Sequence, residues 1–191
     1  MKKLLLPLLI AAMALCTTQA VQAQSNIGFR TGLNFATFVD RPSNTSVDSR
    51  TGLLVGTYFN FKLVSIPVWI QTEGLYTQKG VESGDATLKM DYLEVPVLVK
   101  VNFGSGRFQP HVYGGPYFGF PINSKITGNN LTLQVNNPET DIGVVLGAGT
   151  DITVGLTKIN IGARYSFGRD DAIQDTPGKN SVISIVTGVV L

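Results

Sequence analysis

The stretch LEVPVLVKVNF, residues 93–103, decides the fold of this chain because an apolar residue stands at every second position. Between these apolar residues stand Glu94, Pro96, Leu98, Lys100 and Asn102. Side chains on a β-strand point alternately to the two faces of the sheet. The stretch therefore predicts a strand with one apolar and one largely polar face, and the medium that each face meets becomes the main question.

Similar alternation predicts eight strands in all. They span residues 26–37, 51–63, 67–78, 88–103, 108–122, 140–152, 156–168 and 180–191. Most reach the 9–11 residues that a tilted strand needs to cross a bilayer. The connections between them are predicted to be long near residues 38–50, 79–87, 123–139 and 169–179, and short near 64–66, 104–107 and 153–155. Long loops at one rim and tight turns at the other are typical of an up-and-down membrane barrel.

The first residues resemble a secretory signal peptide. Lys2 and Lys3 form a positive n-region, residues 4–15 an apolar region, and Val21-Gln22-Ala23 a cleavage site. The apolar region is too short for a comfortable membrane span. We therefore expect residues 1–23 to be removed after export across the inner membrane, and residues 24–191 to form one domain.

The composition of residues 24–191 excludes several classes of function. Loss of two lysines leaves 13 Lys and Arg against 13 Asp and Glu, so no basic surface for nucleic acid exists. The single cysteine, Cys16, is lost as well, which excludes disulfides and thiolate metal sites. With one histidine, every common metal pattern fails, and we expect neither a metal nor a cofactor. No later run of 18 apolar residues predicts a helical membrane span.

Alternation alone also fits a soluble barrel that holds a ligand inside. Three features favour lipid on the apolar face. Glycines gather on the polar faces, as a crowded lumen requires, at Gly28, Gly32, Gly56, Gly143, Gly147, Gly149, Gly162 and Gly188. Aromatic residues of the apolar faces lie near segment ends, as in interfacial girdles, at Phe29, Phe35, Phe59, Phe61, Tyr76, Phe103, Phe120 and Phe167. The last segment alternates up to residue 191.

The charged residues of the strands fix which face points inward. The reverse orientation would turn Arg30, Glu73, Glu94, Lys100 and Arg164 towards lipid. Each basic residue near the bilayer midplane would then cost about 2–4 kcal/mol. We therefore expect these five side chains in the lumen as a structural charge network. The narrow interior of eight strands favours a network that fills and closes the barrel. The alternative is a polar pathway for ions or small solutes.

Five stretches carry a resemblance to a known family. They are VWIQTEGLYTQKG (68–80), YLEVPVLVK (92–100), VYGGPYFGF (112–120), DIGVVLGAG (141–149) and GARYSFG (162–168). Their order and spacing resemble the outer-membrane β-barrel domain of small "porin family" proteins, which are similar in architecture to OmpA/OmpX-type barrels. The resemblance implies an all-β fold, an eight-stranded antiparallel up-and-down transmembrane β-barrel, in the outer membrane of a Gram-negative envelope. It implies location and fold only, because the family is defined by shape.

The expected function is that of a non-enzymatic integral outer-membrane protein with a side-chain-filled lumen. Its exposed loops, above all residues 123–139, would serve interaction with an extracellular partner or envelope structure. The expected partners are outer-membrane lipid and, during insertion, the barrel-assembly machinery, and we expect a monomer. The family usually ends in an aromatic residue that this machinery reads, where this chain has Leu191.

Three alternatives remain open at this point. The chain is otherwise a small porin-like pore, a barrel enzyme that acts on lipid, or a soluble ligand-carrying barrel. The enzyme would depend on His111, the one histidine, together with a nucleophile and a carboxylate. His111 follows the predicted short turn at 104–107, away from the long loops, so we expect an ordinary lumen or rim histidine.

Overall fold

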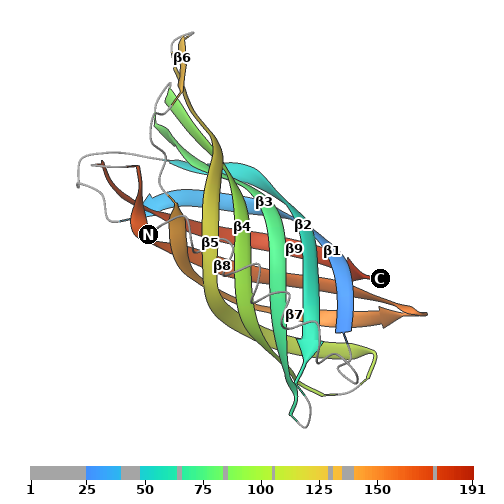
Figure 1. Cartoon of the computed structure of the whole chain (residues 1–191). Helices are drawn as coiled ribbons and strands as arrows, with labels where there is room; N and C mark the ends of the chain where they lie inside the picture. The colour runs from blue at the N-terminus through green and yellow to red at the C-terminus, as the bar shows by residue number, and fades with distance from the viewer. Residues whose placement is uncertain are drawn as a thin grey trace.

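The computed structural model describes residues 25–39, 48–63, 66–83, 86–104, 106–128, 131–134, 140–173 and 176–191. The signal peptide predicted at residues 1–23 lies outside these ranges. The described elements are strands (Figure 1): β1 (Ser25–Val39), β2 (Asp48–Lys62), β3 (Val68–Ser83), β4 (Ala86–Asn102), β5 (Phe108–Gly128), β6 (Leu131–Gln134), β7 (Asp141–Val154), β8 (Thr157–Ile173) and β9 (Thr176–Val190). Within the described ranges, no helix is both long and apolar enough to cross a membrane.

Eight of the strands close into an antiparallel barrel. Each strand pairs with its neighbours in chain order, β1 pairs with β9, and β4 with β5, while the short β6 only extends β5. Figure 1 shows the strands wrapping obliquely around one axis. Closure matters because an open sheet edge leaves backbone N–H and C=O groups unpaired. The predicted eight-stranded antiparallel barrel is therefore confirmed.

Several strands are longer than the sequence predicted. β3 and β4 are separated only by residues 84–85, and β8 and β9 only by residues 174–175, so the long loops predicted at 79–87 and 169–179 are wrong. β5 runs on to Gly128, inside the predicted loop 123–139. Figure 1 shows β3, β4 and β5 rising beyond one rim with β6 at the tip. Beyond the apolar belt the hydrogen-bonded ladder continues without the alternation that made the strands recognisable.

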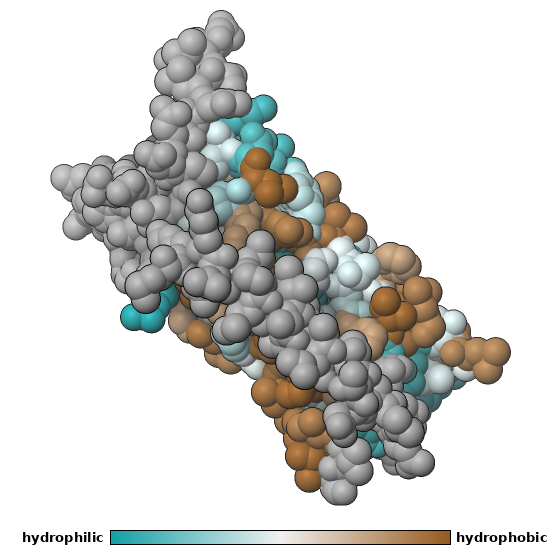
Figure 2. All heavy atoms as spheres, in the orientation of Figure 1, coloured by the Kyte–Doolittle hydropathy of each residue, from teal (hydrophilic) through white to brown (hydrophobic). Residues whose placement is uncertain are grey.

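The two faces of the wall differ as the alternation predicted. Val99 is 49% exposed, whereas the next residue, Lys100, is 4% exposed. Phe29 and Arg30 repeat this contrast at 58% and 2%. Apolar side chains cover much of the wall that is visible in Figure 2. The outer face of the barrel is therefore an apolar belt, and the polar face is turned into the lumen.

Tyrosine rings explain why glycines stand on the inner face. Tyr113 lies over Gly147, and Tyr117 lies over Gly143, so that a Cβ atom at either glycine would overlap the ring. At Gly143 a Cβ would also meet the backbone oxygen of Phe167 on β8. These large rings of β5 therefore fit inside the lumen only because the neighbouring strand β7 has glycine at the paired positions.

We predict that Gly143→Ala lowers the free energy of unfolding by about 1–3 kcal/mol, as overpacking in a dense interior does. The control is Gly74→Ala on the outer face, where a Cβ would have only Thr57 Oγ1 near it, at 4.0 Å. Urea titration of the folded protein in vesicles, followed by heat-modifiable migration on a gel, measures both variants. Equal midpoints for the two variants would contradict this packing account.

Candidate functional site

The centre of the lumen is an ion-pair network around Glu73 of β3. Arg30 of β1 donates from Nη1 to Glu73 Oε1, and Arg164 of β8 donates from Nη1 to Glu73 Oε2 at 2.7 Å. Gln71 Nε2 adds a hydrogen bond to Oε1 at 2.5 Å. The three charged side chains are at most 1% exposed. Because β9 lies between β1 and β8, this network joins three separate parts of the wall across the lumen.

The same network extends towards the short-turn end of the barrel. Arg30 Nη2 donates to Asn160 Oδ1 at 3.2 Å, and Asn160 Nδ2 donates to Asp151 Oδ1 at 2.7 Å. Lys100 Nζ donates to the other oxygen of Asp151, also at 2.7 Å. Hydrogen bonds thus run without a break from Glu73 to Lys100, and we call this set the lower network.

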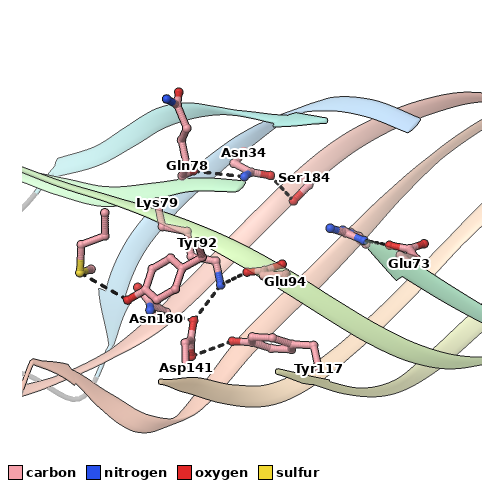
Figure 3. A network of polar contacts seen from close by, with 12 residues as sticks. Asn34, Glu73, Gln78, Lys79, Tyr92, Glu94, Tyr117, Asp141, Asn180 and Ser184 are labelled. Carbon is pink, nitrogen blue, oxygen red and sulfur yellow. Dashed lines mark hydrogen bonds and ion pairs between the residues drawn. The ribbon is translucent and has the colours of Figure 1, made fainter. Parts of the chain in front are cut away.

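A second set, the upper network, surrounds Lys79 nearer the long extensions of the strands. The Lys79 ammonium lies 2.5 Å from Glu94 Oε1 and 2.8 Å from Asp141 Oδ2, between the two carboxylates (Figure 3). It also lies 4.7 Å from the ring centroid of Tyr117 and 5.3 Å from that of Tyr92, where cation–π attraction adds to the ion pairs. The Tyr117 hydroxyl donates to Asp141 Oδ1 at 3.0 Å.

Apolar side chains pack between and beside the two networks. Leu54, Leu75 and Val186 form one buried cluster, and Leu98, Tyr113, Tyr117 and Val145 form another. Leu75 stands between Glu73 and Lys79 along β3, and Val145 stands between Asp141 and Asp151 along β7. We call these seven side chains the apolar layer. It fills the middle of the lumen, where the sequence suggested only charges.

The structure places the five predicted lumen residues as follows. All five are buried, with exposed fractions between 2% and 4%. Arg30, Glu73 and Arg164 contact one another, Lys100 joins them through Asp151 and Asn160, and Glu94 belongs to the upper network instead. Sequence reasoning left out Lys79, Asp141 and Asp151. Lys79 could have been found by continuing the alternation of Glu73 past the predicted end of the third strand.

The charges of the two networks balance in number. The two networks contain four cations, Arg30, Lys79, Lys100 and Arg164, and four carboxylates, Glu73, Glu94, Asp141 and Asp151. A buried charge without a partner would be strongly destabilising. Direct ion pairs therefore neutralise the charges of the two networks.

His111 lies beside the lower network, where its ring is close to Asn160, Gln109 and Asp151. Its Nε2 lies 3.3 Å from Asn160 Nδ2, and its Nδ1 lies 3.4 Å from the Gln109 carbonyl oxygen and 3.8 Å from Asp151 Oδ2. Among the described residues, no hydroxyl is at hydrogen-bond distance from the ring, as nucleophilic catalysis would require. Nor do the described residues contain three or more His, Cys, Asp or Glu side chains grouped to hold a metal ion.

A family model described as "Outer membrane protein beta-barrel domain" matches residues 21–174. The chain belongs to this family. The matched residues include β1 to β8 of the barrel. Comparison with curated protein sequences gave no significant match.

Solved structures of small membrane barrels share the fold. Neisserial surface protein A (NspA) matches with a TM-score of 0.59 and 11% identity over 86% of this chain and 96% of its own. OprG from Pseudomonas aeruginosa gives 0.53 and 16%, over 88% and 97% of the two chains. The attachment invasion locus protein Ail of Yersinia pestis gives 0.52 and 13%, over 87% and 97%. At such identities the likeness establishes the fold of this domain and no shared activity.

We predict that Glu73→Gln destabilises the barrel by about 3–5 kcal/mol, because two buried guanidinium groups lose their shared carboxylate. The triple variant Arg30→Met/Glu73→Leu/Arg164→Met should lose much less, since it leaves no buried charge unpaired. Urea unfolding in vesicles measures both variants. A triple variant that is less stable than Glu73→Gln would show that the ion pairs themselves hold the fold.

Proposed function

We propose that this protein is a non-enzymatic integral protein of the outer membrane with a closed lumen, exported by the signal peptide at residues 1–23. Its strand extensions and loops beyond one rim would serve interaction or envelope structure. The observation that carries the proposal is the apolar belt on the outside of a barrel whose ion pairs lie buried inside. We further propose that outer-membrane lipid covers the belt and that the barrel-assembly machinery inserts the chain.

The height of the belt supports its placement in a bilayer. On β4 the outward apolar positions run from Leu93 to Val101 and continue to Phe103, just beyond the strand. Ten steps from residue to residue, at a rise of about 3.3 Å and a tilt of about 40°, span roughly 25 Å along the barrel axis. Membrane barrels carry an apolar band of about this height.

The filling of the lumen supports a closed barrel over a pore. Ion pairs cross the lumen from β3 to β1 and β8, and the apolar layer occupies the middle between the two networks. A hydrophobic constriction resists water and ions even where it is not fully sealed by atoms. The apolar layer is therefore the part of the lumen that we expect to prevent conduction.

We predict that the purified protein gives no steady channels in planar bilayers, whereas Leu54→Ser/Leu75→Ser conducts. These substitutions remove two members of the apolar layer and let water join the two networks. The control is Leu53→Ser/Leu93→Ser, which changes two outward residues. Leu53 precedes Leu54 in β2, and Leu93 precedes Glu94, the β4 residue that pairs with Leu75.

The outcomes separate the two candidate functions. Steady open channels of the unchanged protein would favour the pore. Conductance of the control variant equal to that of the lumen variant would show that the apolar layer is not the barrier. Folding of each variant is checked by heat-modifiable migration before recording.

A further inference from the structure

On the side of the long strand extensions, the outward face of β3, β4 and β5 changes composition in layers. Each layer consists of directly paired residues, because alternate residues of neighbouring strands share a face. The last apolar layer is Tyr76, Leu93 and Phe120. Two polar layers follow it, first Gln78, Asp91 and Asn123, then Gly80, Lys89 and Lys125. The second polar layer brings two lysines together on the outside of the barrel, and we call Lys89 and Lys125 the lysine pair.

The lysine pair lies at the level where lipid headgroups would surround the barrel. Tyr76 and Phe120 flank Leu93, and aromatic residues of this kind mark the edge of the hydrocarbon in membrane proteins. Lys89 stands four steps beyond Leu93 on β4, which is roughly 10 Å along the barrel axis. The headgroup region extends about 5–7 Å beyond the hydrocarbon, and a lysine side chain can reach back towards it. Both ammonium groups can therefore contact headgroups.

The two charges of the lysine pair repel each other and lack a counterion on the protein. Lys89 and Lys125 stand directly opposite each other in the β4–β5 ladder. Both side chains are half-buried, and neither ammonium group makes a hydrogen bond or an ion pair within the described part of the chain. Like charges directly opposite each other destabilise an antiparallel pair of strands. The arrangement becomes favourable when an anion from outside the protein lies between the two ammonium groups.

The neighbours of the lysine pair leave it both charge and room for such an anion. Asp91, the acid in the layer below, is 4% exposed, and its Oδ2 accepts a hydrogen bond from Asn123 Nδ2 at 3.0 Å. One carboxylate facing two ammonium groups still leaves a net positive charge. On the β3 side of Lys89 stands Gly80, with φ +135°, which contributes no side chain. The wall beside Lys89 is therefore open to a headgroup.

We propose that the lysine pair binds the phosphate group of a lipid headgroup in the leaflet beside this rim. The inference rests on the proposed placement in the bilayer, and it names the part of the lipid that the wall recognises. Lysine binds phosphate as a compact positive charge with freely rotating donors. Because Lys89 and Lys125 are cross-strand partners, their ammonium groups can contact two oxygens of one phosphate. The site lies on the outside of the barrel, apart from the two networks of the lumen.

The apolar layer of the wall below the lysine pair favours a lipid over a free anion. Leu93 is 47% exposed and Phe120 is 41% exposed, on the same two strands and the same face as the lysines. A phosphorylated lipid contacts both levels at once, with its phosphate on the lysine pair and its acyl chains on Leu93 and Phe120. Inorganic phosphate contacts the lysines alone. The stacking of a basic layer over an apolar one therefore fits an anionic lipid.

Titration of the folded protein in an uncharged detergent with dioctanoyl phosphatidic acid, followed by native mass spectrometry, tests the proposal. Lys89→Gln/Lys125→Gln should raise the dissociation constant about 25-fold, because each lysine near an anionic headgroup contributes about a factor of five. Lys89→Arg/Lys125→Arg should retain binding, since both charges remain. The matched control is Lys62→Gln/Lys158→Gln, which removes two lysines at the short-turn end of β2 and β8 and should leave binding unchanged.

Equal affinity of the glutamine variant and the unchanged protein, or an equal loss in the control, would overturn the site. Displacement of phosphatidic acid by an equal concentration of inorganic phosphate would overturn the assignment to a lipid. Leu93→Cys in phosphatidylcholine vesicles tests the proposed function separately, because residues 24–191 contain no cysteine. If a water-soluble maleimide labels this cysteine, the belt faces water and both proposals fail. If the cysteine is shielded and the glutamine variant still binds, only the phosphate site is overturned.

Discussion

The absence of water in hydrocarbon governs this structure. A backbone N–H or C=O group that faces acyl chains must find its partner within the protein, so a sheet in a bilayer has to close on itself. The pairing of β1 with β9 provides that closure, and the apolar belt is its outer consequence. Closure also confines the inward charged side chains to a narrow lumen, where those of the two networks pair with one another. The apolar outer wall and the paired charges of the lumen therefore both follow from closure of the sheet.

The lumen meets this constraint with ion pairs, rings and an apolar layer. Buried ion pairs add little net stability compared with apolar packing, but an unpaired member is very unfavourable. We infer that Glu73 and Lys79 act mainly by specifying which strands face each other, because each joins strands that are not neighbours in the sheet. We propose that the apolar layer keeps the two networks from merging into a water-filled pathway.

The sequence predicted the strands wherever the outer face of the wall is apolar and the inner face is largely polar. Residues 93–103 alternate because one face of the strand is the apolar outer face and the other lines the lumen. For the same reason Arg30 and Glu94 could be assigned to the lumen. Prediction failed where the strands left the belt, and it therefore placed Lys79 in a loop. It also could not pair the charges. Glu73 meets Arg30 and Arg164, while Glu94 meets Lys79, only because of the stagger between strands at closure, which no local pattern encodes.

Nitroxide labels on the outward and inward faces of β4 test most directly whether hydrocarbon covers the apolar face. Labels at Val97 and at Lys100, with a further outward label at Ile161, are compared in vesicles by power-saturation electron paramagnetic resonance. The outward labels should be relaxed more by oxygen, which dissolves in hydrocarbon, than by a water-soluble nickel complex, and the inward label should be shielded from both. Strong relaxation of the labels at Val97 and Ile161 by the nickel complex would show that water covers the apolar face and would contradict the account.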